Sequence, residues 1–231
     1  EKSAKVVPSS LKFINIAGLV EGASQGQGLG NQFLGHIRNV DAVAHVVRLF
    51  SDTDVVHVSG HLDPVRDLEL IITELMLADL EFLERKLHKS RKLARSGDDA
   101  AKAETALAEA FSKSLGEGKI PDVSGLSESE KKIVSQMGMI TIMPSFVCAN
   151  VDEEIFRNFG KEESSKKLID FAATKNMEVV PVCGKLEEEL AQLDPDEVKE
   201  FLAEMGMHES GLDRVIHTGY KLLNYITFFT A

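Results

Sequence analysis

Short apolar runs alternate with longer amphipathic stretches along the chain. An apolar run of about four to eight residues bounded by turn-forming residues is typical of a buried strand, whereas apolar positions three and four residues apart are typical of a helix. The strand candidates are residues 11–17, 42–47, 146–149 and 177–183. Helix-like patterns follow at residues 31–39, at 162–174 and after 183. This alternation predicts an α/β fold in which helices cover both faces of a parallel sheet.

A helical hairpin interrupts this alternation. Asp63 followed by Pro64 marks a helix start, and apolar residues then recur every three or four positions as far as Arg95. A turn at residues 96–98 separates this helix from a second apolar stripe, residues 103–115, whose four-residue spacing predicts a return helix packed on the first.

A third, shorter helix follows the hairpin, because Ser127 and Glu130 have the spacing of a capping box. We therefore expect two domains. The α/β domain comprises residues 1–61 and 141–231, and the inserted helical domain comprises residues 62–140.

Composition and charge exclude several classes of protein. The 231 residues contain 26 Lys and Arg against 37 Asp and Glu, a net charge of −11, which excludes a uniformly basic nucleic-acid coat; we expect no DNA sequence specificity. No apolar run reaches the ~18 residues of a membrane span, so we expect no membrane partner. Cys148 and Cys183 lie in apolar runs, which fits buried thiols of a cytoplasmic protein better than a disulfide framework or a cysteine-based metal site.

Glycines are concentrated after the first apolar run. The loop Gly22-Ala23-Ser24-Gln25-Gly26-Gln27-Gly28-Leu29-Gly30 has four glycines in nine residues, which permits unusual backbone angles and indicates mobility. Three segments together resemble the YchF/Obg-like ATPase family. They are this loop with its continuation to Leu34, the preceding Asn15-Ile16-Ala17-Gly18-Leu19-Val20, and the later Asn150-Val151-Asp152-Glu153. The similarity extends from about Leu11 to Ala231.

The resemblance implies a fold and an activity. Members are P-loop NTPases of the translation-factor class, so we expect a parallel-sheet, G-domain-like core with an inserted α-helical hairpin domain. The implied activity is binding of ATP with Mg²⁺ and slow hydrolysis to ADP and phosphate, as a ribosome-associated regulatory switch. Two alternatives stay open: a GTP-binding GTPase of the Obg class, and a non-catalytic ribosome or RNA interaction module.

The resemblance also implies roles near the γ-phosphate. Gly18 would face this phosphate through its amide and begin a switch loop. Asn15 stands where related nucleotidases have an aspartate that holds Mg²⁺ through water, and a neutral amide is a weaker ligand. Leu19 replaces the water-orienting glutamine of related GTPases, so His57 is the implied catalytic residue; a packing or surface role for it is the alternative. The switch-loop glycines are Gly22, Gly26, Gly28 and Gly30.

The implied base-binding motif replaces the guanine-specific Asn-Lys-x-Asp. Asn150 matches the first residue of that motif, Val151 takes the place of the lysine, and Glu153 takes the place of the aspartate with a longer side chain. In this family, this departure accompanies a preference for ATP. Without the family, an Asx turn before an acidic helix start is the better explanation of the motif. Its position after a strand favours the functional interpretation. The backbone contacts to the base would come from Val182, Cys183 and Gly184.

One element of the family is absent from the sequence. Nothing matches Gly-x-x-x-x-Gly-Lys-Ser/Thr, the loop whose amides and lysine cradle phosphates. We expect this chain to be the middle of a longer protein, with the phosphate loop before Leu11 and a TGS domain after Ala231. We also expect the isolated segment to bind nucleotide poorly.

Charge changes sign along the long predicted helix. Residues 63–83 carry six acids and one arginine, whereas residues 84–95 carry six bases and one glutamate. This pattern complements the helix macrodipole. Alternatively, Arg85, Lys89 and Lys92, which are three and four positions apart on one face, contact ribosomal RNA.

Overall fold

The computed structural model describes residues 10–16, 34–51 and 62–226, and the chain divides into two compact units. The sheet unit comprises Glu1–Asn15, Ala44–Leu62 and Ser145–Ala231, and the helical unit comprises Ile16–Val43 and Asp63–Pro144. Each unit is described by itself below. No helix in the described ranges is long and apolar enough to cross a membrane.

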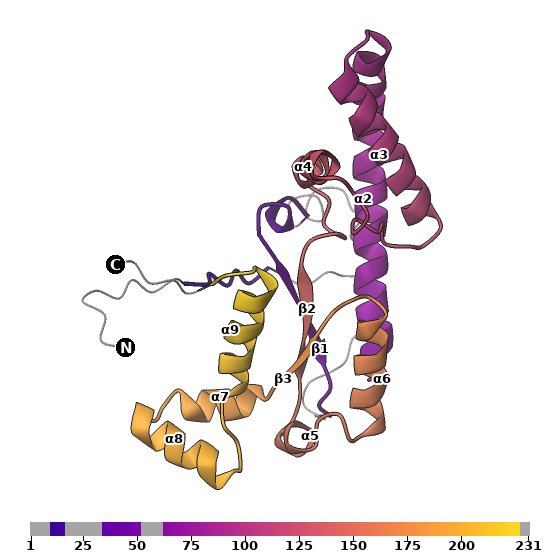
Figure 1. The fold of residues 1–231 in the computed structure, drawn as a ribbon. Helices are drawn as coiled ribbons and strands as arrows, with labels where there is room; N and C mark the ends of the chain where they lie inside the picture. Colours follow the sequence, from indigo (N-terminus) through magenta and orange to yellow (C-terminus); the bar gives the residue numbers. More distant parts are fainter. Residues whose placement is uncertain (1–9, 17–33, 52–61, 227–231) are drawn as a thin grey trace, which may run out of the picture. The chain divides into compact units, whose positions relative to one another are not determined.

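The sheet unit is built on a parallel sheet with the strand order β1-β2-β3 (Figure 1). The strands are β1 (Val43–Arg48), β2 (Ser145–Asn150) and β3 (Val179–Val182). β2 and β3 pair from Val147↔Val179 to Asn150↔Val182. At the end of β1, the Leu49 amide donates to the Asn150 carbonyl at 2.7 Å. The parallel α/β class predicted from the sequence is confirmed.

Helices cover the two faces of this sheet. The helices of this unit are α5 (Glu153–Arg157), α6 (Glu163–Ala173), α7 (Gly184–Leu190), α8 (Pro195–Glu204) and α9 (Gly211–Leu222), and it is α6 and α9 that lie against the strands. Val215 of α9 packs with Phe146 and Val180, whose side chains share one face of the sheet. Figure 1 shows α6 on the opposite side of the strands from α9, and Leu168 and Ala172 of α6 are fully buried.

The histidine of β1 is a core residue. His45 is only 6% exposed, and desolvation by burial lowers its pKa to about 4. Its imidazole is therefore neutral at physiological pH.

The prediction of a strand at residues 11–17 is wrong for residues 11–16, which the structure describes. Residues 10–16 have no regular secondary structure, and Phe13 and Ile14 are 55% and 52% exposed. A strand requires a neighbouring strand as hydrogen-bond partner, and the described sheet does not include this segment. An apolar run alone carries no information about such a partner.

The helical unit contains the predicted hairpin and the short third helix. The helices are α2 (Pro64–Arg95), α3 (Asp99–Gly116) and α4 (Glu128–Met137). The caps are those expected: Asp63 accepts from the Arg66 amide at 3.1 Å, and Ser127 and Glu130 form a capping box. The 32 residues of α2 span roughly 48 Å. The domain boundaries stay a prediction.

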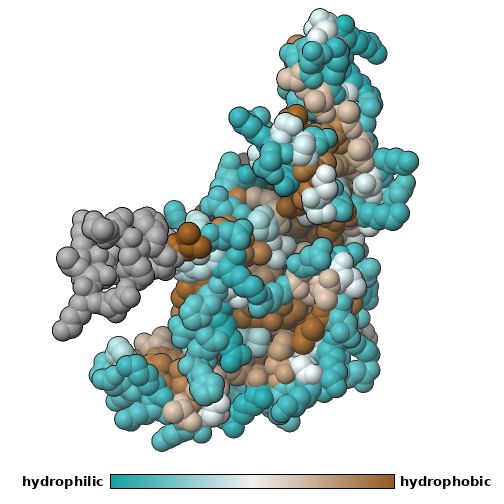
Figure 2. Space-filling view, in the orientation of Figure 1, coloured by the Kyte–Doolittle hydropathy of each residue, from teal (hydrophilic) through white to brown (hydrophobic). Residues whose placement is uncertain are grey.

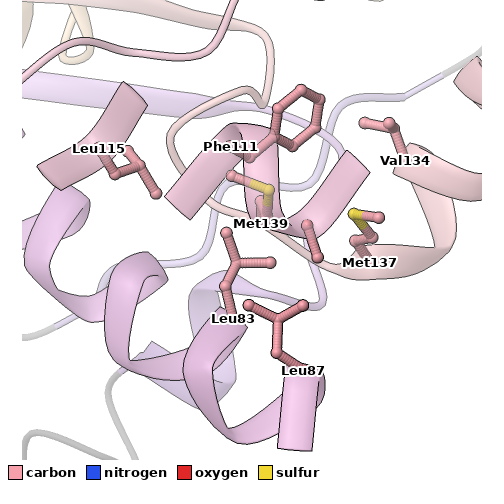
Figure 3. Close-up of a cluster of buried hydrophobic side chains, with 8 residues drawn as sticks. Leu83, Leu87, Phe111, Leu115, Val134, Met137 and Met139 are labelled. Carbon is pink, nitrogen blue, oxygen red and sulfur yellow. The ribbon is translucent and has the colours of Figure 1, made fainter. Parts of the chain in front are cut away.

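One apolar cluster joins these three helices (Figure 3). Leu83 and Leu87 of α2 face Phe111 and Leu115 of α3, with Val134, Met137 and Met139 completing the cluster. A second cluster packs Leu34 and Ile37 against Leu75 and Ala78 of α2. Leu34 and Ile37 belong to a single helical turn, residues 34–37, within the helix-like pattern predicted at 31–39.

A buried carboxylate lies next to this second cluster. The Asp79 side chain is 0% exposed, and its Oδ2 accepts from the amides of Ile140 and Thr141, both at 2.8 Å, and from the Thr141 hydroxyl at 2.9 Å. Its Oδ1 lies 2.9 Å from Nη1 of Arg38. The Arg38 guanidinium also donates to the Gly138 carbonyl and lies 4.1 Å from the Phe82 ring centroid. Asp79 therefore joins three segments that are far apart in sequence.

We predict that Asp79→Ala destabilises the helical unit by about 3–5 kcal/mol, because it leaves Arg38 without its counter-charge and the buried Ile140 amide and the partly buried Thr141 amide without their acceptor. Urea unfolding followed by circular dichroism measures the loss. Asp99→Ala is the matched control, since it removes an exposed carboxylate paired with Lys102 and should leave stability nearly unchanged. Equal midpoints for the two variants would contradict the prediction.

Candidate functional site

The two segments predicted to bind the base lie side by side at the carboxyl edge of the sheet. Asn150 ends β2, Val182 ends β3, and the two residues are partners in the strand register. Beyond them, the Val151 amide donates to the Val182 carbonyl at 2.9 Å. In open parallel α/β sheets, ligands bind at this edge, where loops leave the strand ends. The arrangement therefore gives a candidate ligand site with two adjacent loops.

The loop after β2 contains three residues in different environments. The Val151 side chain is buried at 2% exposure, so this residue serves the core. Asp152 is the N-cap of α5, where its Oδ1 accepts from the Ile155 amide at 2.8 Å. The predicted helix start is thus present, with Asp152 as its cap, whereas the Glu153 carboxylate is not used in this cap.

The Glu153 carboxylate has cationic neighbours. Its side chain is 41% exposed, with Nη2 of Arg157 at 3.8 Å and Nζ of Lys185 at 4.0 Å. Lys185 belongs to α7, so this ion pair links the loop after β2 with the helix that follows β3. Both separations are at the long end for an ion pair in partial contact with water, and neither holds the carboxylate rigidly.

The loop after β3 places its backbone at the same edge. Cys183 is 1% exposed and is the N-cap residue of α7, which begins at Gly184. A Cβ built on Gly184 would lie 3.7 Å from Oδ1 of Asn150, so the Asn150 side chain points towards this glycine. The structure thus brings Asn150, Glu153 and residues 182–184 together.

The two cysteines differ in exposure: Cys183 is buried, as predicted, whereas Cys148 is partly exposed. Both Cys148 and Cys183 are free, and burial raises the pKa of Cys148 to about 11. A thiol with so high a pKa is a poor nucleophile at neutral pH.

One contact at this edge could not be predicted from the sequence. The Gly211 amide, at the start of α9, donates to Oε1 of Glu187 in α7 at 2.7 Å. A Cβ on Gly211 would lie only 3.1 Å from the Cα of Val182 and 3.3 Å from the carbonyl oxygen of Pro181. The only sequence indication is the capping box of Ser210 and Asp213, which predicts a helix start and says nothing of its tertiary partner.

Most residues predicted to act at the γ-phosphate lie outside the described residues. These are Gly18, Gly22, Gly26, Gly28, Gly30 and His57. Asn15 is described and is exposed. Within the described ranges, no three His, Cys, Asp or Glu side chains gather as they would around a metal ion. These residues alone do not fit a Mg²⁺ site, because Asn15 offers a single neutral donor.

The basic end of α2 is partly neutralised in the helical unit. Arg85 pairs with Glu81 at 2.7 Å, and Arg91 pairs with Glu109 of α3 at 2.9 Å. Lys89 and Lys92 are exposed and have no ion-pair partner among the residues that the structure describes. Hydrophilic residues cover most of the hairpin end in Figure 2. Of the three residues predicted to contact RNA, Lys89 and Lys92 therefore retain their charge unpaired.

No family model matches the chain. Several known proteins are similar to it in sequence, and they carry the same name. The chain is 44% identical over 230 residues to the ribosome-binding ATPase YchF of Escherichia coli O157:H7 and 42% identical over 227 residues to that of Bacillus subtilis strain 168. The two alignments cover 100% and 98% of this chain but 62% of each relative.

A solved structure agrees with these sequence relatives. The Schizosaccharomyces pombe YchF GTPase is 36% identical, with a TM-score of 0.77, over 94% of this chain and 59% of that one. The chain thus spans about three-fifths of the length of the relatives that it matches.

Proposed function

Because the chain belongs to the YchF/Obg-like ATPase family, we propose that it forms the base-binding and helical parts of a cytoplasmic P-loop NTPase. This enzyme would hydrolyse ATP slowly and regulate a ribosome-associated step. One observation carries the proposal: Asn150, Glu153 and residues 182–184 share one sheet edge. The phosphate loop would come from sequence upstream of this chain.

The chemistry of the base site favours adenine. A guanine-binding carboxylate accepts hydrogen bonds from two adjacent N–H groups of the base, whereas adenine presents only its exocyclic amine and an unprotonated ring nitrogen there. The charges of Arg157 and Lys185, at 3.8 Å and 4.0 Å from the Glu153 carboxylate, would offset the repulsion between this carboxylate and the adenine ring nitrogen. The Asn150 amide has both a donor and an acceptor and can serve either base. GTP stays the second candidate nucleotide, since the solved relative is named a GTPase.

Hydrolysis needs a group that orients water. Leu19 has no polar atom for this purpose, so we assign the role to His57, in line with the family resemblance. Gly18 and the glycines at 22, 26, 28 and 30 would form the switch loop that responds to the γ-phosphate. Mg²⁺, which in such enzymes neutralises phosphate charge, would be held mainly by the nucleotide, with Asn15 as one neutral donor through water.

The helical unit would supply the ribosome contact. Lys89 and Lys92 lie three residues apart and are exposed near the end of α2, an arrangement suited to the phosphates of ribosomal RNA. Without hydrolysis, the same surface would still serve a non-catalytic interaction module, which is the alternative function.

We predict that Asn150→Ala, made in the chain extended to the length of its relatives, weakens ATP binding about tenfold, because it removes the side chain aimed at the base. Calorimetric titration with ATP and GTP measures both affinities. Glu154→Ala is the control, since Glu154 is the exposed neighbour of Glu153. Unchanged ATP affinity in Asn150→Ala would exclude this edge as the base site, and tighter binding of GTP than of ATP in the parent protein would favour the alternative nucleotide.

For His57→Ala in the same extended protein, phosphate release should slow about 100-fold at unchanged ATP affinity, because the residue would act on water and not on the base. His36→Ala, which removes an exposed histidine, should hydrolyse ATP normally. Full activity in His57→Ala would remove this residue from the mechanism.

Reversing the charge at the hairpin end, with Lys89→Glu and Lys92→Glu together, should weaken co-sedimentation of the extended protein with ribosomes. The slope of log affinity against log salt should fall by about 1.5, the loss of two phosphate contacts. The control is the double variant Lys113→Glu with Lys119→Glu. It changes the net charge of the protein by the same amount, but in α3 and the residues that follow it. If both double variants bind alike, the α2 end is not a major contact.

A further inference from the structure

Glu187 holds together two elements of the sheet unit that meet at the candidate base site. It belongs to α7, the seven-residue helix that begins directly after Cys183. Its Oε1 accepts from the Gly211 amide, the first residue of α9, at 2.7 Å. The charge of the carboxylate suits the positive end of a helix, where the first amides have no partner within the helix.

Local interactions anchor α7 weakly. A helix of seven residues is marginal by itself, and the Cys183 side chain makes no capping hydrogen bond to it. Leu186 and Leu190 are buried and hold one side of the helix. The hydrogen bond of Glu187 is therefore a directional tertiary contact that ties α7 to the start of α9.

The partner helix, in contrast, is firmly held. Ser210 and Asp213 cap the start of α9, and Val215 packs with Phe146 and Val180 in the core of the sheet unit. Gly211 lies so close to the backbone of β3 that a methyl group would come within 3.1 Å of the Cα of Val182. The start of α9 thus serves as a fixed support against the end of β3.

We propose that Glu187 is a positioning residue for purine recognition, which rests on the base site proposed above. By bonding the start of α9, it sets the position of the Cys183–Gly184 backbone relative to Asn150. Backbone groups discriminate adenine from guanine through donors and acceptors at fixed places, so a small displacement of this loop changes both the affinity for ATP and the preference over GTP. Glu187 itself does not touch the base.

The test uses the chain extended to the length of its relatives and compares Glu187→Ala, Glu187→Gln and Glu187→Asp. Glu187→Ala should raise the Kd for ATP about tenfold and lower the ATP-to-GTP preference, with kcat at saturating ATP nearly unchanged. Glutamine keeps an acceptor oxygen at the same reach and should restore most of the affinity. Aspartate is one methylene shorter and should behave like alanine.

Glu188→Ala provides the matched control, because Glu188 is the exposed neighbour of Glu187 on the same helix; it should bind both nucleotides normally. Gly211→Ala approaches the same contact from the other side. Its added methyl group would press on the β3 backbone, so it should shift the ATP-to-GTP preference in the same direction as Glu187→Ala.

Three outcomes would overturn the inference. The first is an unchanged Kd and preference in Glu187→Ala. The second is an aspartate variant that binds like the parent protein, which decides the matter even if the alanine variant does not fold. The third is a loss in kcat and affinity together that glutamine does not rescue, since this indicates a merely structural role. Failure of the base site itself is distinct: the parent protein would then bind no ATP, or Asn150→Ala would bind it normally.

Discussion

The helical unit depends on the stabilisation of one buried charge. Asp79 is shielded from water, and a carboxylate in such a place is tolerated only when donors replace its hydration. Two amides and one hydroxyl donate to its Oδ2, and the Arg38 guanidinium pairs with Oδ1 through its charge. These donors come from sequence positions 38, 140 and 141, so satisfying the charge also fixes the turn after α4 and the segment before β1 on the side of α2. Leu34 and Ile37 then add apolar contacts to Leu75 and Ala78. The charge makes the arrangement specific, and the apolar contacts make it favourable.

Local chemistry explains which elements could be predicted. The caps at Asp63 and at Ser127 with Glu130 act within one turn of their helices, so the sequence determines them directly. The partners of Asp79 lie about forty and sixty residues away, and no periodicity reveals them. Asp79 and Glu74 belong to the acids of the first part of α2, which complement the helix macrodipole by their charge. Both are buried, and the sequence pattern does not indicate this. The apolar run at residues 11–17 predicts a strand, but strand formation depends on a partner, and the described sheet offers none to residues 11–16.

The same distinction applies to the functional surfaces. The family resemblance assigns Asn150 and residues 182–184 to the base site, the strand pattern puts them at the ends of two strands, and parallel pairing makes Asn150 and Val182 neighbours. The sequence could not show that Val151 serves the core, because this depends on what surrounds the loop. The residues at the end of α2 carry a net charge of about +5 by themselves. Glu104 and Glu109 of α3 pair with Lys86 and Arg91 and reduce this charge. Which acids face α2 is a matter of helix packing.

The burial of His45 makes the stability of the sheet unit depend on pH. In the folded state, its pKa is about 4, whereas in the unfolded chain the imidazole has its ordinary value near 6.5. Unfolding below pH ~6.5 is therefore accompanied by proton uptake at this site. The folded-state pKa is the lower one, so the stability that neutral His45 permits is complete above pH ~6.5 and declines as the pH falls towards about 4. Mild acid thus acts on the central sheet through a residue remote from the candidate base site.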